Sequence, residues 1–202
     1  MTKKRPYAHV ARLYDLLDLP FEHGRYQPIR RMLFEGLGGT ILDAGVGTGR
    51  NIPFYPPGAE VVGIDLSPQM LARARRRKER LGSPVELIEM DATATAFPDA
   101  HFDFAVATFL FCVLDNDEQL PGLKELARVV KPEGEIRIIE YAYSQRPMKR
   151  FVMRLWAPWV RFAYGATFDR DTERYVEDAG LRLVAKRFVF EDIIKLLVLK
   201  PR

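Results

Sequence analysis

Short apolar segments alternate with helical segments between residues 40 and 142, and this alternation constrains the fold more than any other feature. Helical periodicity is expected over 68–81 and 117–130. Strands separated by helices are typical of βαβ units, whose strands build a parallel sheet. The strand candidates lie at 40–44, 60–64, 85–89, 103–108 and 135–142. The sequence therefore predicts an α/β fold with a doubly wound sheet.

The last forty residues predict a change of strand direction. A helix is expected from about Arg170 to Ala179, followed by strands at 181–189 and 193–199. Only three residues separate these strands, which is too few for a parallel crossover. They must pair as an antiparallel hairpin near one edge of the sheet.

Two segments flank the alternating region. Apolar residues at helical spacing predict a helix over 7–19, and Pro28 suits the first turn of a second helix that ends near Leu37. We expect 1–37 to form a helical cover and 144–168 to be a basic, aromatic insert. A chain of 202 residues is long enough for one core, so 1–202 is predicted to be a single domain.

Composition excludes several classes of protein. The lone Cys112 cannot form an intramolecular disulfide, and His9, His23 and His101 lack the spacing of metal ligands, so no metal site is expected. No apolar run is long enough to span a bilayer, and no export signal is recognised. The formal net charge of +4 is concentrated in 1–31 and 144–164, which indicates an anionic partner.

A glycine-rich segment follows the first predicted strand. Gly45, Gly47 and Gly49 allow a ligand to lie against the backbone at the carboxyl end of that strand, although packing glycines in a tight turn would look the same. A dinucleotide fingerprint would have glycine where Arg50 stands, and the lysine of a P-loop is missing. The segment therefore does not predict a polyphosphate ligand.

Three acids follow three successive predicted strands: Asp43, Asp65 and Asp91. A carboxylate such as Asp65 can accept hydrogen bonds from both hydroxyls of a ribose, and Asp91 can accept one from an adenine amine. Because the acids would repel a pyrophosphate, they favour a cationic ligand that carries a nucleoside.

Four motifs together resemble the class I S-adenosylmethionine-dependent methyltransferases. They read ILDAGVGTG, VVGIDLSPQML, EMDATATAFPDAHFDFAVATF and VKPEGEI, in the family's order. The resemblance implies a Rossmann-like seven-stranded sheet in the order 3-2-1-4-5-7-6, with strand 7 antiparallel and helices on both faces. Strand 4 is not followed by Asn/Asp-Pro-Pro-aromatic, which argues against nucleobase and glutamine acceptors.

The resemblance also implies a position for each part of the cofactor, S-adenosylmethionine. Its methionine portion would contact Tyr14, Asp43, Gly45 and Gly47, and its ribose would contact Asp65. Its adenine would lie between Leu66 and Met70, with Asp91 and Ala92 reading its edge. The floor of the methyl-transfer site would be Phe109 and Leu110.

Within that family, the chain looks most like the bacterial phosphatidylethanolamine N-methyltransferases, with the quinone-ring C-methyltransferases as the alternative. Residues 147–164 combine aromatic, methionine and basic side chains without an acid, which suits a phospholipid headgroup layer. A lid helix with its aromatics on the core is the other interpretation. Clustering of tryptophan with methionine and leucine fits lipid better than nucleic acid. We expect a cytoplasmic enzyme, peripherally bound to the inner face of the membrane.

Transfer to an amine requires a neutral nitrogen held in line with the methyl group. Tyr26 and Tyr141 are the candidate catalytic residues, because a tyrosine hydroxyl can accept a hydrogen bond from the amine. Arg150 and Arg154 are candidates for holding the lipid phosphate, and His23 is a further candidate on the substrate side.

Overall fold

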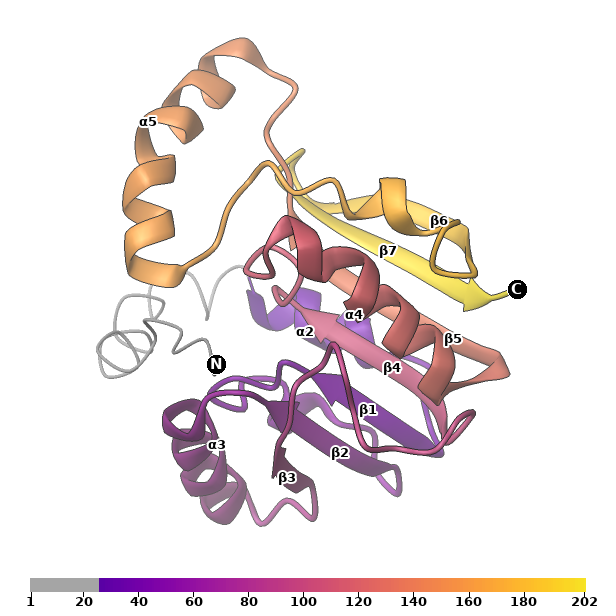
Figure 1. The fold of residues 1–202 in the computed structure, drawn as a ribbon. Coiled ribbons are helices and arrows are strands. Elements are labelled where there is room, and N and C mark those ends of the chain that lie inside the picture. The colour runs from indigo at the N-terminus through magenta and orange to yellow at the C-terminus, as the bar shows by residue number, and fades with distance from the viewer. Residues whose placement is uncertain (1–25) are drawn as a thin grey trace.

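A computed structural model describes residues 26–202, apart from the side chains of 162–164. Its sheet has seven strands in the order β3-β2-β1-β4-β5-β7-β6, as predicted (Figure 1). Strand β7 is antiparallel to both of its neighbours, and the other pairs are parallel. The strands are β1 (Thr40–Ala44), β2 (Glu60–Asp65), β3 (Glu86–Glu89), β4 (Phe102–Thr108), β5 (Val130–Tyr141), β6 (Leu181–Phe190) and β7 (Ile194–Pro201).

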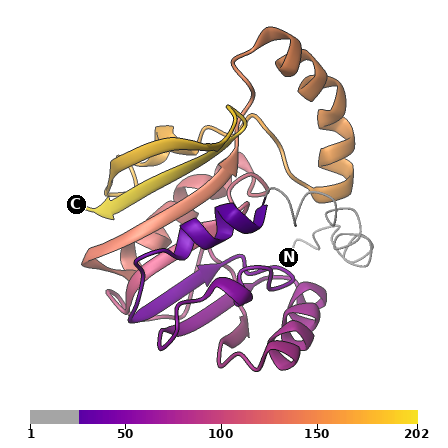
Figure 2. The same cartoon turned by 180° about the vertical axis from the view of Figure 1, so that it is seen from behind.

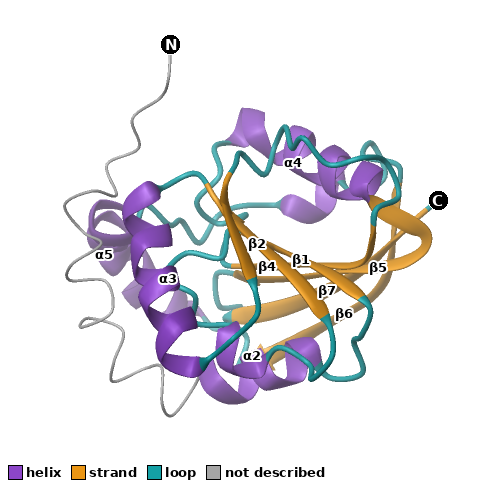
Figure 3. Ribbon diagram, turned by 90° about the horizontal axis from the view of Figure 1, so that it is seen from below, coloured by secondary structure: helices purple, strands orange, loops and turns teal. Residues whose placement is uncertain are grey.

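Helices connect the strands and cover both faces of the sheet (Figures 1 and 3). Apolar side chains of α2, among them Ile29 and Leu33, pack on one face, whereas Leu123 and Leu126 of α4 pack on the other. The α-helices are α2 (Gln27–Phe34), α3 (Pro68–Leu81), α4 (Asn116–Val129) and α5 (Pro147–Tyr164). Two short 3₁₀ helices are η2 (Ile52–Phe54) and η3 (Thr172–Tyr175). The expected helix over 7–19 lies outside the described residues.

Local chemistry explains where α3 and α4 begin. The hydroxyl of Ser67 accepts a hydrogen bond from the Met70 amide at 3.3 Å, and Pro68 occupies the first turn of α3. A reciprocal capping box formed by Asp115 and Glu118 starts α4. The cap of α3 comes directly after Asp65, so it sets the direction in which the helix leaves the carboxyl edge of the sheet.

The helix expected over 170–179 is wrong, because only η3 forms there, followed by turns. The buried hydroxyl of Thr172 donates to Glu140 on β5 at 2.6 Å and contacts the Gln119 side-chain oxygen at 3.0 Å. Glu140 in turn pairs with Lys195 of β7 at 3.0 Å, and Lys195 also pairs with Glu173 at 2.6 Å. These tertiary bonds hold the segment in a shape that an α-helix would not give.

Strand β5 also begins earlier than predicted, at Val130 instead of 135. The Pro132–Gly134 turn lies within it, and the register against β4 shifts between Phe102 and Phe104. A Cβ atom at Gly134 would lie 2.5 Å from the Asp103 carbonyl oxygen, so only glycine allows this close approach.

The insert predicted at 144–168 contains α5, which stands away from the sheet (Figures 1 and 2). Many of its apolar side chains are exposed to solvent: Met148 is 76% exposed, Phe151 65%, Leu155 71% and Trp156 55%. The lid interpretation, with aromatics buried on the core, is therefore wrong for these residues. Among residues 26–202, none of the helices has the length and apolar character needed to cross a bilayer.

Candidate functional site

The glycine loop after β1 leaves a stretch of backbone uncovered. Gly45 and Gly47 adopt left-handed φ angles of +73° and +57°. A Cβ atom at Gly45 would lie 3.0 Å from Leu110, whereas one at Gly47 would find no heavy atom closer than the Gly45 carbonyl oxygen, at 3.9 Å. Gly45 therefore serves close packing, and Gly47 leaves space in which a ligand can approach the backbone.

The carboxylate of Asp65 connects the end of β2 to this loop. One oxygen accepts a hydrogen bond from the Gly47 amide at 2.9 Å, and the other accepts one from the Ser67 amide at 2.8 Å. These two bonds orient the carboxylate, a group whose two oxygens suit the two hydroxyls of a ribose. Gly47 and Asp65, predicted to contact different parts of one ligand, are thus adjacent.

Asp43 is fully buried on β1 instead of facing the rim of the sheet. The amide of Asn51 donates to both of its oxygens at 3.2 and 3.0 Å, and the Tyr55 hydroxyl donates to one of them at 2.6 Å. Arg30 of α2 donates to the side-chain oxygen of Asn51 at 2.7 Å. Burial outweighs these bonds and raises the pKa of Asp43 to about 6.

Sequence reasoning did not predict Asn51, Tyr55 or Arg30 as parts of the site. Asn51 also donates to Thr108 at the end of β4 at 3.0 Å, so it connects β1 to β4 beneath the glycine loop. The position of Asn51 directly after the glycine loop was the one sequence signal that could have identified it as part of the site. An isolated polar residue gives no periodic pattern from which its contacts could be predicted.

Residues expected to contact a purine follow β2 and β3. Leu66 is 43% exposed, and Met70 is buried within the first turn of α3. Asp91 accepts the amide and the hydroxyl of Thr93 at 2.8 and 2.7 Å, and both bonds fall on Oδ1. Ala92 is half-buried. The chemistry of this set, a carboxylate beside apolar side chains, fits the edge and the faces of an adenine ring.

The two candidate catalytic residues meet although they are 115 positions apart. Tyr26 begins α2 and Tyr141 ends β5, and their hydroxyl oxygens are 2.8 Å apart. Phe109 lies edge-on to Tyr26 at 5.5 Å between ring centroids and stacks on Tyr141 at 4.5 Å. Phe168, which sequence reasoning missed because it lies in an irregular segment, packs edge-on against Tyr141 at 5.5 Å. Together with Tyr143, these residues are called the aromatic cluster below.

Phe109 adopts a left-handed φ of +57°, which is unfavourable for a side chain of its size. Its amide donates to the Ile139 carbonyl at 2.7 Å, and its own carbonyl accepts from the Cys112 thiol at 3.1 Å. Burial raises the pKa of that thiol well above its usual range. Strained backbone of this kind gathers at functional sites, so it adds weight to the cluster as a place for chemistry.

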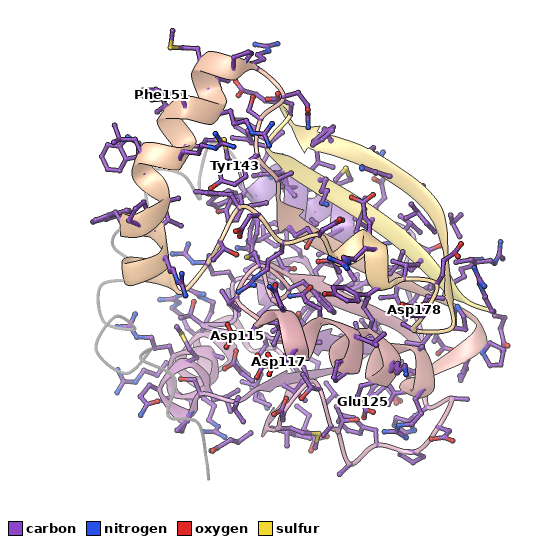
Figure 4. The ribbon with its side chains drawn as sticks, turned by 45° about the horizontal axis from the view of Figure 1, so that its top comes forward. Asp115, Asp117, Glu125, Tyr143, Phe151 and Asp178 are labelled. Atoms are coloured by element: carbon purple, nitrogen blue, oxygen red, sulfur yellow. The ribbon has the colours of Figure 1, made fainter. Side chains whose placement is uncertain are left out.

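The basic candidates on the substrate side are placed differently. The guanidinium of Arg150 lies 5.9 Å from the ring centroid of Tyr143, at the edge of the aromatic cluster. Arg154, one turn further along α5, is exposed. Figure 4 shows Tyr143 nearer the sheet than Phe151, which stands on the raised helix. Tyr14 and His23 lie outside the described residues.

A glycine loop with an uncovered backbone and acids on neighbouring strand ends define a Rossmann-like protein with a nucleoside site at the carboxyl edge of its sheet. Residues 41–134 match the family described as "Methyltransferase domain". A solved S-adenosylmethionine-dependent methyltransferase from Aquifex aeolicus superposes with a TM-score of 0.69 at 24% identity, covering 97% of this chain and 98% of that one.

Curated relatives fall into two groups by acceptor. A phosphatidylethanolamine N-methyltransferase from Cereibacter sphaeroides is 45% identical over 52% of this chain and 51% of its own length. A demethylmenaquinone methyltransferase from Thermus thermophilus is 37% identical over 67% of this chain and 64% of its own length. The chain thus spans between half and two thirds of these relatives. By its domain match over 41–134 and by its fold, the chain is similar to the S-adenosylmethionine-dependent methyltransferases.

Proposed function

We propose that the protein transfers methyl groups from S-adenosylmethionine to the headgroup amine of phosphatidylethanolamine, and to its methylated products, towards phosphatidylcholine. The observation that carries the proposal is the hydrogen-bonded pair Tyr26 and Tyr141 within the aromatic cluster. The 45% identical relative that bears this activity in its name supports it.

The residues of the glycine loop and of β2 fit the cofactor. Gly47 offers uncovered backbone to the methionine portion and Asp65 accepts the ribose hydroxyls, while Leu66 and Met70 bound the adenine. Asp43 acts from beneath, where it keeps Asn51 in place and contributes negative charge. S-adenosylmethionine supplies an electrophilic methyl group on a sulfonium sulfur.

On the acceptor side, Tyr26 and Tyr141 are the catalytic residues of this proposal. One hydroxyl of the pair donates to the other, which leaves lone pairs to accept hydrogen bonds from the amine. Those bonds hold the nitrogen in line, and positioning of this kind supplies much of the rate of a bimolecular transfer. The faces of Phe109 and Tyr141 stabilise the positive charge of the methylated products.

Helix α5 suits a reaction at a membrane surface, on the cytoplasmic side where we expect the protein. It exposes Phe151, Leu155 and Trp156 together with the guanidinium groups of Arg150 and Arg154. Aromatic side chains settle at the boundary between headgroups and acyl chains, and arginine pairs with phosphate in two-point geometry. Because the guanidinium of Arg150 lies over the ring of Tyr143, a phosphate bound by Arg150 would lie beside the aromatic cluster.

The test is transfer of a radiolabelled methyl group from S-adenosylmethionine to phosphatidylethanolamine vesicles, with demethylmenaquinone vesicles in parallel. Labelled mono-, di- or trimethylated phospholipid, separated by thin-layer chromatography, is the expected result. Labelled quinone with unlabelled phospholipid would overturn the proposal in favour of ring C-methylation, the alternative that the 37% identical relative favours.

Hydroxyl-deleted variants test the tyrosine pair. Tyr26→Phe and Tyr141→Phe should each lower kcat on phosphatidylethanolamine while the Kd for S-adenosylmethionine stays unchanged. Tyr175→Phe is the matched control, because Tyr175 lies in η3 and packs against Arg174 instead. Equal kcat for all three variants and the parent protein would remove the pair from the reaction.

A further inference from the structure

Helix α3 carries a run of cations that the reaction does not use. Between positions 73 and 80 it reads RARRRKER, with a single acid. Arg75, Arg76 and Arg80 are exposed and make no salt bridge with any described residue. Some other surface cations are paired: Lys131 pairs with Asp103, and Arg128 and Arg137 pair with neighbouring glutamates. Arg182 and Arg187 on β6 are exposed and without a salt bridge to a described residue, but they are not part of such a run. Arg75, Arg76 and Arg80 therefore carry positive charge that is available to a partner.

This helix lies on the same side of the molecule as α5. In Figures 1, 2 and 3 the two helices occupy one side, and β6 lies at the far end of the sheet from α3. Arg154 of α5 is likewise exposed and without a salt bridge to any described residue. The two helices that carry these unpaired cations are far apart in the sequence but thus lie on one side of the molecule.

The apolar side chains exposed on α3 and α5 indicate what kind of partner these helices bind. Phe151, Leu155 and Trp156 of α5 are between 55% and 71% exposed, and Leu81 at the end of α3 is 47% exposed. Cations beside inserted apolar side chains complement a surface with anionic headgroups over an acyl layer. A nucleic acid would use the cations but would leave the apolar side chains in water.

We propose that α3 and α5 form a two-part docking surface for membranes that contain anionic phospholipid, in which α5 supplies apolar insertion and α3 supplies electrostatic attachment. The inference rests on the proposed function in that the methyl acceptor is also a lipid. The guanidinium of Arg77 donates to the Thr48 carbonyl at 2.7 Å, so the docked helix also holds the glycine loop. Attachment through α3 therefore fixes the cofactor loop relative to the lipid surface.

Paired charge variants test the role of α3. Arg75→Gln with Arg76→Gln removes two cations from α3, and Arg182→Gln with Arg187→Gln removes two exposed cations from β6. Binding to vesicles of phosphatidylcholine with 30% phosphatidylglycerol would be measured by co-sedimentation at ~0.1 M salt, where charges still act across about 10 Å. Each cation close to an anionic surface contributes a factor of roughly 5.

The α3 variant should therefore bind these vesicles roughly 25-fold more weakly than the parent protein, with little change for the β6 variant. Equal weakening of both variants would mean that only total charge matters, which would overturn the inference. An unchanged α3 variant with intact circular dichroism would also overturn it. So would a variant that loses affinity for single-stranded RNA but keeps its vesicle binding, since α3 would then be a nucleic-acid surface.

A separate assay distinguishes failure of the docking surface from failure of the proposed function. Dihexanoyl phosphatidylethanolamine is soluble and needs no vesicle, so the α3 variant should methylate it as fast as the parent protein. If the parent protein binds anionic vesicles through α3 but methylates neither form of the lipid, the docking surface stands and the acceptor is wrong. A loss of turnover on the soluble lipid in the α3 variant would overturn the separation of docking from chemistry.

Discussion

Gly47→Ala should separate ligand binding from stability more sharply than any other single change in the glycine loop. The new methyl group has room in the folded protein, because the closest heavy atom is the Gly45 carbonyl oxygen at 3.9 Å. Its cost to folding is therefore confined to the φ of +57°, which is unfavourable for alanine by about 1 to 2 kcal/mol. For a chain of this size, that corresponds to a fall in Tm of roughly 2 to 8 °C.

The effect on cofactor affinity has a different origin. If the methionine portion of the cofactor lies against Gly47, the methyl group overpacks that contact at a cost of about 1 to 3 kcal/mol. The Kd for S-adenosylmethionine should then rise roughly 5- to 150-fold. Gly45→Ala should instead lose more stability, because its Cβ atom would lie 3.0 Å from Leu110.

Gly58→Ala is the matched control. Gly58 is exposed, has a φ of +78° and would place a Cβ atom with no heavy atom within 4 Å, so its folding cost should be similar. Isothermal titration calorimetry gives the Kd and differential scanning calorimetry gives Tm for both variants. Parent-like affinity in Gly47→Ala, or an equal loss in Gly58→Ala, would refute the placement of the cofactor.

Three further predictions follow from buried and loop-binding groups. Lys195→Met should lower the free energy of unfolding by about 3 to 5 kcal/mol in urea titrations, because Glu140 is left buried without its cation, and adding Glu140→Gln should recover part of the loss. Because the pKa of Asp43 is raised to about 6, the native state binds its proton more tightly than the unfolded state does. The free energy of unfolding should therefore fall as the pH rises from about 4 to about 6. Asp43→Asn should abolish this fall, and Tyr55→Phe, which removes a bond that lowers the pKa, should move it to higher pH; a profile identical to that of the parent protein would contradict both. Asp65→Ala should abolish S-adenosylmethionine binding in calorimetry, and unchanged affinity would rule out its ribose contact.

Most of the sheet could be predicted from the sequence because its signals are local. Apolar runs and helix caps define each βα unit, and the short link between the last two strands permits only a hairpin. The segment 170–179 could not be predicted in this way. Its conformation depends on Thr172 meeting Glu140 and Gln119, which come from other parts of the chain.

The site was predictable to a different extent on its two sides. Tyr26 and Tyr141 were predicted separately, each for the chemistry of its hydroxyl, and the structure brings the two hydroxyl groups within hydrogen-bond distance. Asp43 was expected on the ligand-facing rim, and the structure buries it. The alternation of side chains along a strand sets which face a residue joins, but the partners that bury it, Asn51 and Tyr55, arrive through loop geometry.

The shielded thiol beneath Phe109 gives this chain an unusual practical property. Cys112 is its only cysteine, and a buried thiol that stays protonated reacts slowly with maleimides and iodoacetamides. A Leu155→Cys variant would then carry one reactive sulfur without any prior removal of native cysteines. An environment-sensitive dye attached there would report the depth of α5 in a bilayer. One added cysteine is therefore enough to label this protein at a single chosen position.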